Sequence, residues 1–134
     1  MDLVDGGVCF VCGKRNEEGL KLDFLLNKEL MTVEASFSPG PKFQGFQGII
    51  HGGIIATLLD EAMGKVAHLL GLKAVTASLE IKFRKPVKIK EKLFVKGEVT
   101  RITSRLVLAK ATIKKEDGSI VAEASGKLLR KESI

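Results

Sequence analysis

An aspartate that follows a His-Gly-Gly triplet by two helical turns is the feature of this sequence best suited to chemistry. The triplet His51-Gly52-Gly53 stands directly before an amphipathic segment that contains Asp60. Glycines at the start of a helix leave unpaired backbone N–H groups at its positive end, where they can hold negative charge developing on a carbonyl oxygen. A partly desolvated carboxylate further along the helix can act as a nucleophile or a general base. The two features together predict a site for attack on a polarised carbonyl.

Each of these features also has an ordinary explanation. A Gly-Gly pair is typical of a tight connection into a helix, and a single mid-helix aspartate more often faces solvent. On a helical wheel with about 100° per residue, Asp60 lies beside the small residues Ala56, Gly64 and Ala67. Small neighbours let another chain or a ligand approach the carboxylate closely, so both interpretations of Asp60 stay open.

The acidic residue next to Asp60 has a simpler interpretation. Glu61 stands four residues before Lys65, which is the favourable order for an ion pair on a helix surface. We therefore expect Glu61 and Lys65 to form an exposed pair, which would account for the acidic residue in structural terms.

One helix and six strands must position these residues. Apolar residues follow the helical period over 53–70, and strict alternation predicts a strand over 75–83. Asp117-Gly118 is a hairpin turn signal, and the glycines and prolines of 38–48 indicate a loop. Further strands are predicted over 19–26, 30–37, 93–102, 106–115 and 120–129. This order predicts an α+β domain with an antiparallel sheet around one helix, and a dimer or larger assembly because one helix cannot cover both faces of such a sheet.

Length and hydropathy bound the class of protein. The chain has 134 residues, which fits one domain, with residues 1–18 as an N-terminal lead-in and 19–134 as the domain itself. The most apolar stretch, 49–72, is interrupted by charged and histidine residues, so no membrane span is expected. The N-terminus lacks the pattern of a signal peptide, and a cytoplasmic location is the expectation.

Charge is distributed unevenly along the chain. Residues 1–80 hold 7 Lys+Arg against 10 Asp+Glu, whereas residues 81–134 hold 15 against 6. A basic half within one domain suggests an anionic ligand, although a solvated lysine-rich surface explains it equally well. The chain has no Trp and no Tyr, so stacking platforms for bases have little support and no nucleic-acid partner is expected.

The two cysteines form a Cys-x-x-Cys pair. Cys9 and Cys12 have the spacing of half a zinc site, but a tetrahedral site needs four ligands. His51 and His68 are the nitrogen candidates, and 17 residues on or beside one helix separate them, so both reaching one metal is not expected. A redox pair is a further interpretation. We favour a structural or incidental role, and no metal site is predicted.

The segment from His51 to Gly64 resembles the helix signature of hotdog-fold acyl-CoA thioesterases. The phenylacetate-degradation type and its hydroxybenzoyl-CoA and mammalian acyl-CoA relatives share HGG followed by Asp or Glu nine positions after the His. Segments 9–13, 19–20 and 75–87 also look like flanking segments of that family. The resemblance implies a hotdog fold, a curved antiparallel sheet of five to six strands around one long helix, and hydrolysis of acyl-CoA thioesters to free acid and coenzyme A. It implies no cofactor, because the coenzyme A ester is the substrate.

The resemblance also implies roles for individual residues. Asp60 would be the catalytic carboxylate, as nucleophile or general base, and the Gly52 N–H would polarise the thioester carbonyl. His51 would shape the loop and the start of the helix, and His51, Gly53 and Gly64 are expected among the substrate-binding residues. A second polar group near the attacking water often comes from the strand after the helix, which makes Thr76 the candidate and Ser78 a weaker one. Thr76 also fits an ordinary strand residue equally well.

One position departs from the family pattern. Many relatives carry Asn or Gln six residues before the His, where its amide orients the thioester or the water. Here that position is Gly45, with Gln44 and Gln47 nearby. Either glutamine serves this purpose, or this branch does without it.

The resemblance gives the basic half a purpose. Coenzyme A carries phosphates, which Arg and Lys side chains bind well. The candidates are Arg84, Lys85, Arg101, Arg105 and Lys114, with Arg84 and Arg105 ranked first. The small residues beside Asp60, including Gly64, agree with a site closed by a second subunit, so a homodimer or homotetramer is expected.

Two alternatives use the same fold. A non-catalytic module would bind acyl-CoA without releasing the thiol, and a hydratase or dehydratase would act on acyl thioesters through a catalytic histidine such as His51. The acyl group itself is not predicted.

Overall fold

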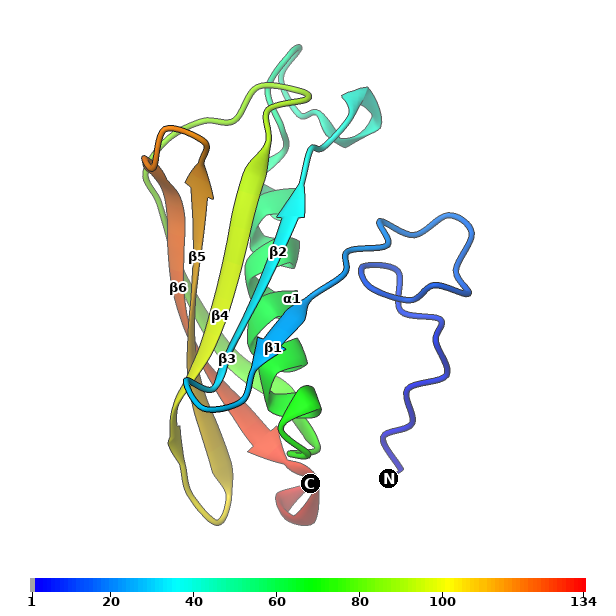
Figure 1. Ribbon diagram of the computed structural model, residues 1–134, viewed down its shortest axis with the longest axis vertical. Helices are drawn as coiled ribbons and strands as arrows, with labels where there is room; N and C mark the ends of the chain where they lie inside the picture. Colours follow the sequence, from blue (N-terminus) through cyan, green and yellow to red (C-terminus); the bar gives the residue numbers. More distant parts are fainter. Residues whose placement is uncertain (1) are drawn as a thin grey trace.

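One long helix packs along one face of a six-stranded antiparallel sheet in the computed structural model, which describes residues 2–134 (Figure 1). The sheet order is β1-β2-β4-β5-β6-β3, so β1 and β3 form its edges. The helix α1 is Gly52–Leu69. The strands are β1 (Leu25–Asn27), β2 (Thr32–Phe37), β3 (Ala74–Phe83), β4 (Leu93–Ile102), β5 (Leu106–Lys115) and β6 (Ile120–Arg130), with short 3₁₀ turns at Pro41–Phe43 and Lys131–Ser133. The expected hotdog fold is confirmed.

The core lies between α1 and the central strands. Along β4, residues alternate between buried and exposed, as expected for a strand with one face against a helix. Gly97 of β4 lies directly under α1, where an added Cβ would stand 2.5 Å from the Ala62 carbonyl oxygen. The absence of a side chain at Gly97 therefore sets how closely the helix approaches the sheet. The buried residues of α1 are Ile55, Leu58, Leu59, Ala62, Met63, Val66 and Ala67.

The edge strand β3 exposes several large apolar side chains. Val75 and Leu79 are each 37% exposed and Phe83 is 56% exposed. The outer backbone groups of this strand face no other strand of the described chain, because β3 is the last strand of the sheet. Exposed apolar side chains on a long unpaired edge are typical of a surface that a second chain covers.

Most predicted elements agree with the structure. The helix begins and ends one residue earlier than the predicted 53–70, and the strands predicted over 93–102 and 106–115 have the observed bounds. The Asp117-Gly118 turn is confirmed by hydrogen bonds from the Lys115 N–H to the Ser119 carbonyl and from the Gly118 N–H to the Lys115 carbonyl, and by the positive φ of Gly118.

The strand predicted over 19–26 is wrong for most of its length. Only Leu25 and Leu26 of that range pair with β2, in the short strand β1. The N–H groups of Leu20 and Leu22 instead donate to the carbonyls of Phe10 and Val11, and Lys21 has a positive φ that breaks the extended run. Leu22 is buried all the same, so the alternation identified a buried face but not a strand of the sheet.

Residues 2–18 contain more order than a loose lead-in. They form hydrogen-bonded turns beside α1, outside the sheet (Figure 1). Val11 is 2% exposed and belongs to the core, and it anchors the segment to the rest of the chain. The division of the chain at residue 18 stays a prediction.

No helix among the described residues could cross a membrane. The helix α1 is not apolar enough, and the other helices are too short.

Candidate active site

The helix α1 begins at a histidine cap. The His51 side chain accepts a hydrogen bond of 2.8 Å from the Gly53 N–H at Nδ1, which satisfies one of the unpaired donors of the first turn. A Cβ at Gly53 would stand 3.0 Å from the same nitrogen, so this cap favours glycine there. Within residues 2–134 the Gly52 N–H makes no hydrogen bond. It remains a backbone donor at the positive end of the helix.

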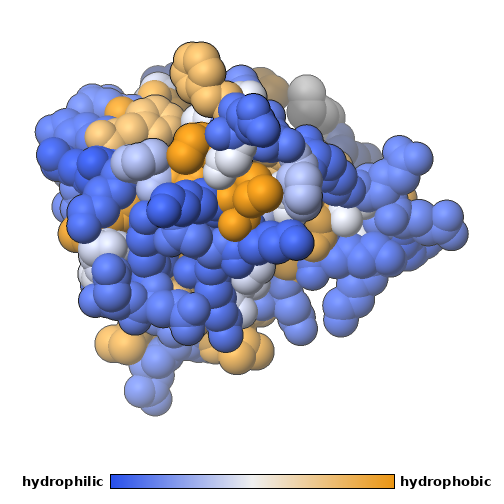
Figure 2. All heavy atoms as spheres, turned by 90° about the horizontal axis from the view of Figure 1, so that it is seen from above, coloured by the Kyte–Doolittle hydropathy of each residue, from blue (hydrophilic) through white to orange (hydrophobic). Residues whose placement is uncertain are grey.

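A groove runs past Gly52. An added Cβ at Gly52 would lie 3.7 Å from the Phe83 ring, so the end of β3 faces the first turn of α1. The groove has a volume of about 290 Å³ and is lined by Ile50, Gly52, Ile55, Phe83, Arg84, Lys85, Pro86 and Val87. It therefore brings together Gly52 and two of the predicted phosphate-binding residues. Figure 2, which views the molecule from this end, shows apolar patches between hydrophilic side chains.

The carboxylate of Asp60 meets the strand that follows the helix. The Thr76 hydroxyl donates a hydrogen bond of 2.7 Å to Asp60 Oδ1. Asp60 is half-buried, whereas Thr76 is exposed at the edge of the sheet. Two residues selected from the sequence thus form one polar pair, on the side of β3 that faces α1.

Ser78 lies on the other face of the sheet. The register of β3 with β6 shifts between Thr76 and Ser78, so Thr76 pairs with the buried Leu128 and Ser78 with the exposed Lys127. Residues that pair across two strands share a face. Thr76 therefore faces the helix and Ser78 faces away from Asp60.

The two candidate glutamines lie in the loop before His51. The Gln44 side chain accepts a hydrogen bond of 2.7 Å from the Gly48 N–H, so its carbonyl oxygen stabilises the loop itself. Gln47 is exposed and its side chain makes no hydrogen bond within residues 2–134. At Gly45, the position where many relatives carry an amide, an added Cβ would lie 3.3 Å from the His51 ring.

The predicted basic residues do not converge on one point. Arg84 forms an ion pair of 3.0 Å with Glu123, whereas Lys85 lines the groove and forms no ion pair within the described chain. Arg105 lies at the opposite end of the sheet, where its carbonyl accepts from the Arg130 N–H beside the start of β3. Arg84 and Arg105 are thus separated by the ten residues of β3, about 30 Å of strand. Arg101 is exposed near the end of β4, at the same end of the sheet as Arg105, which lies in the turn between β4 and β5.

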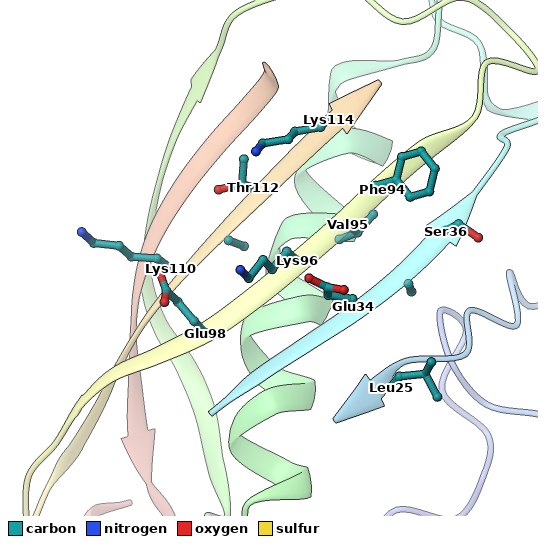
Figure 3. A pocket seen from close by; sticks show the side chains of 12 residues that line it. Leu25, Glu34, Ser36, Phe94, Val95, Lys96, Glu98, Lys110, Thr112 and Lys114 are labelled. Atoms are coloured by element: carbon teal, nitrogen blue, oxygen red, sulfur yellow. The ribbon is translucent and has the colours of Figure 1, made fainter. Parts of the chain in front are cut away.

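A wide hollow lies on the face of the sheet away from α1. It measures about 620 Å³ and crosses β2, β4 and β5, and its charged side chains point outward from the sheet (Figure 3). They include Glu34, Lys96, Glu98, Lys110 and Lys114. The sheet separates this surface from Asp60, so Lys114 does not share the groove with Gly52.

The exposed ion pair expected between Glu61 and Lys65 is wrong. Residues of the N-terminal segment cover this part of α1, and the Glu61 carboxylate lies 3.8 Å from Cys9 Sγ. Lys65 Nζ lies 3.7 Å from Cys12 Sγ. Burial raises the pKa of Glu61, and burial together with the nearby Glu61 raises the pKa of the Cys12 thiol to about 12. Sequence reasoning missed this cluster, because helical spacing carries no information about a covering segment.

Ala67 also differs from its expected position. It is 1% exposed, although the wheel placed it among the open small residues beside Asp60. Ala56 and Gly64 are only half-buried, and a Cβ at Gly64 would meet no atom within 4 Å. The open surface beside Asp60 is therefore narrower than the sequence indicated.

Sequence reasoning also missed Phe83, whose ring faces Gly52. Phe83 is the last apolar residue of the alternation along β3, and this position could have identified it as a residue near the start of the helix.

Comparisons with known proteins define the family. Residues 47–122 match the family model described as the thioesterase superfamily. This match covers more than half of the chain, and the chain therefore belongs to the thioesterase superfamily. Acyl-coenzyme A thioesterase THEM4 of Rattus norvegicus is 32% identical over 103 residues, which are 75% of this chain and 44% of that protein. The chain thus spans about half the length of the curated relatives it matches.

Solved structures agree in fold. A thioesterase superfamily protein has a TM-score of 0.85 and 23% identity, covering 92% of this chain and 60% of its own. A hypothetical thioesterase from Streptococcus pneumoniae TIGR4, solved with coenzyme A, has a TM-score of 0.77 and 24% identity, covering 82% of this chain and 85% of its own. That same protein has also been solved with an aspartate or a threonine replaced by alanine.

Proposed function

We propose that the chain hydrolyses acyl-CoA thioesters to a carboxylic acid and coenzyme A. The observation that carries the proposal is the pairing of Asp60 with Thr76 on a helix whose first turn presents the Gly52 N–H. Attack on a polarised carbonyl requires a donor for the carbonyl oxygen and a fixed carboxylate. Eight residues of one helix separate Gly52 from Asp60 by about 12 Å, so the two groups that act on one carbonyl come from two subunits in this proposal. The likeness to acyl-coenzyme A thioesterases supports the same reaction class.

The reaction uses one carboxylate and one water. The Gly52 N–H donates to the thioester carbonyl oxygen, where negative charge develops as the tetrahedral intermediate forms. Thr76 holds Oδ1 of Asp60, and in the proposed reaction Oδ2 acts on the water or on the carbonyl carbon. Asp60 either takes a proton from water as the water attacks, or attacks the carbonyl carbon itself and is released by water afterwards. In both routes the C–S bond breaks and the leaving sulfur takes up a proton, from Asp60 in the first route and from solvent water in the second, so that coenzyme A departs as the thiol.

Groups at the start of α1 are suited to the polar part of the substrate. Lys85 and Arg84 line the groove that contains Gly52, at the end of the helix that favours anions. Coenzyme A is bound in the Streptococcus pneumoniae structure, which supports a coenzyme A ester as ligand for this fold. The His51 Nδ1 is engaged by the Gly53 N–H, and this contact favours a capping role for His51 over proton transfer in a hydration reaction.

A second subunit completes the proposed site. The apolar side chains exposed along β3 and the small half-buried residues of α1 beside Asp60 form adjoining surfaces that a partner chain would cover. We therefore propose a homodimer, or a homotetramer built from such dimers, with active sites between subunits. Mass measurement in solution tests this assembly, and a monomer at assay concentrations would contradict it.

The experiment that tests the activity is a panel of acyl-CoA esters, aryl and aliphatic, assayed by trapping of the released thiol. We expect turnover with at least one member of the panel. Calorimetric titration with the same esters separates the alternatives, because a non-catalytic module binds them without releasing thiol. Binding without turnover across the panel would contradict the proposal. Hydration leaves the C–S bond intact, so thiol release itself argues against the hydratase interpretation, and thiol release by a His51→Ala variant would show that the hydrolysis does not require that histidine.

A further inference from the structure

A cluster outside the proposed active site joins the N-terminal segment to α1. The sulfurs of Cys9 and Cys12 and a carboxylate oxygen of Glu61 all lie within 4.8 Å of one another. Cys9 Sγ lies 3.9 and 3.8 Å from the two Glu61 oxygens. Two sulfurs and a carboxylate thus point toward one small volume, and all three residues are half-buried.

The separations suit a tetrahedral metal ion. With Zn–S bonds of about 2.3 Å and Zn–O bonds of about 2.0 Å, two ligand atoms stand roughly 3.5–3.8 Å apart around zinc. The distances from Cys9 Sγ to the Glu61 oxygens, 3.9 and 3.8 Å, are within a few tenths of an ångström of that range, and all three ligand atoms lie within 4.8 Å of one another. Small side-chain rotations would bring the three ligand atoms onto one ion.

The backbone around the cysteines holds the sulfurs in place. The Val11 N–H donates to Cys9 Sγ at 3.4 Å, a contact that stabilises a thiolate and orients it. The Gly13 N–H donates to the Cys9 carbonyl at 2.8 Å, closing the turn between the two cysteines. A Cβ at Gly13 would stand 2.5 Å from backbone atoms of Cys9, so this tight turn requires glycine.

A divalent cation would balance the charge of its ligands. When zinc displaces the protons of the two thiols, two thiolates and one carboxylate face a single ammonium group, that of Lys65, whose Nζ lies 3.7 Å from Cys12 Sγ. The protein groups then carry two net negative charges in a half-buried place, where an uncompensated charge is costly. A divalent ion matches that deficit.

We propose that Cys9, Cys12 and Glu61 bind one zinc ion, with water as the fourth ligand. Two thiolate ligands select a borderline-soft metal such as Zn²⁺ over Mg²⁺ or Ca²⁺, which prefer oxygen. The ion fastens residues 2–18 to α1 at Glu61, the residue directly after Asp60. The ion would lie outside the proposed active site, because Asp60 is not one of its ligands.

The test measures metal binding directly, on untagged protein purified under reducing conditions. We expect about one zinc per chain, removable by a chelator and restored by dialysis against Zn²⁺. Replacement by Co²⁺ should give a thiolate-to-cobalt charge-transfer absorption and tetrahedral ligand-field bands. Cys9→Ser and Cys12→Ser should each weaken zinc binding by more than about 100-fold, beyond the loss typical of a second-shell partner. Glu61→Gln should weaken it as well.

The matched control is Glu17→Gln, which makes the same chemical change at an exposed position of the same segment. It should bind zinc as the parent chain does. Circular dichroism shows that each variant remains folded, and the cobalt spectrum of the parent chain tests the site without any substitution. The proposal is overturned if the reduced parent chain takes up no zinc, or if a Cys9→Ser/Cys12→Ser double variant binds equally well. A Cys9–Cys12 disulfide that persists under reducing conditions would also overturn it.

Discussion

The Thr76 hydroxyl on β3 lies 2.7 Å from Oδ1 of Asp60 on α1 and donates a hydrogen bond to it. This contact fixes one oxygen of the carboxylate, and the other oxygen accepts no hydrogen bond within residues 2–134. A charged acceptor makes such a bond stronger than a bond between neutral groups. The edge strand therefore positions the carboxylate that the helix carries.

Removal of the Thr76 hydroxyl should lower activity without unfolding the protein. A Thr76→Val variant loses the donor but keeps the shape, and kcat/KM should fall by about 10- to 100-fold, since a hydrogen bond to a charged group contributes about 1.5–3 kcal/mol. Thr76→Ser should recover most of the loss because it restores the hydroxyl. Steady-state kinetics on the best ester of the panel gives both values. Ser78→Ala, on the other face of the sheet, is the control, and an equal loss there would contradict a positioning role for Thr76.

Lys85 should affect substrate binding more than turnover. Lys85→Ala removes a cation from the groove beside Gly52, and KM for an acyl-CoA should rise about 2- to 5-fold with kcat nearly unchanged, the range of an exposed ion pair. The difference should shrink as salt concentration rises, because salt screens exposed charges. Kinetics at low and high ionic strength measure it. Lys28→Ala, in the turn between β1 and β2, should change neither constant, and a salt-independent rise in KM for Lys85→Ala would contradict phosphate binding.

The close approach of α1 to β4 should make Gly97 intolerant of a side chain. A Cβ there would lie 2.5 Å from the Ala62 carbonyl oxygen, so Gly97→Ala must shift the helix and should cost about 3 kcal/mol of unfolding free energy. Gly40→Ala is the matched control, because a Cβ at Gly40 meets nothing within 4 Å and its φ of −82° suits alanine. Urea denaturation of both variants checks the difference. Equal stabilities would show that the helix does not depend on this contact.

Glu91 should stabilise the fold only while it is ionised. Its carboxylate accepts from the Lys88 N–H and lies 3.2 Å from Lys115 Nζ, and the backbone hydrogen bond, followed by Lys115, lowers the pKa of Glu91 below its ordinary 4.5. A lowered carboxyl pKa means stability that is present above pH 4.5 and lost as the pH falls through the folded-state value. Glu91→Gln should therefore cost about 0.5–1 kcal/mol at pH 7 and progressively less in acid.

Thermal unfolding of Glu91→Gln and the parent chain from neutral to acid pH measures this dependence. Glu29→Gln, at an exposed turn position, is the control and should follow the parent chain throughout. A constant deficit for Glu91→Gln at every pH would contradict an ionic contribution.

The helix and four long strands could be predicted because their patterns are local. The apolar period of α1 and the alternation along β4 and β5 are properties of neighbouring residues, and short turn signals separate them. The resemblance to a family made Thr76 a candidate for a polar group near the attacking water, but its pairing with Asp60 was not predicted. Its geometry depends on how β3 returns beside α1, which no local pattern specifies.

Features that depend on distant segments were missed. Glu61 seemed to be an exposed partner of Lys65, because a helical wheel does not show that residues 9–12 lie over it. The apolar alternation over 19–26 marks a segment with buried side chains. Most of this segment does not join the sheet, because its N–H groups donate to the carbonyls of residues 10 and 11. In both cases the N-terminal segment decides the outcome through contacts far apart in sequence.

The most direct test of the proposed function is the activity of Asp60→Asn beside Asp23→Asn. The two variants make the same chemical change, at the half-buried carboxylate on α1 and at an exposed position before β1. We expect kcat/KM of Asp60→Asn to fall about 100- to 10,000-fold, the range for loss of a general base, with an unchanged circular dichroism spectrum. Asp23→Asn should retain parental activity. Full thiol release by a folded Asp60→Asn variant would contradict the proposal that Asp60 carries the reaction.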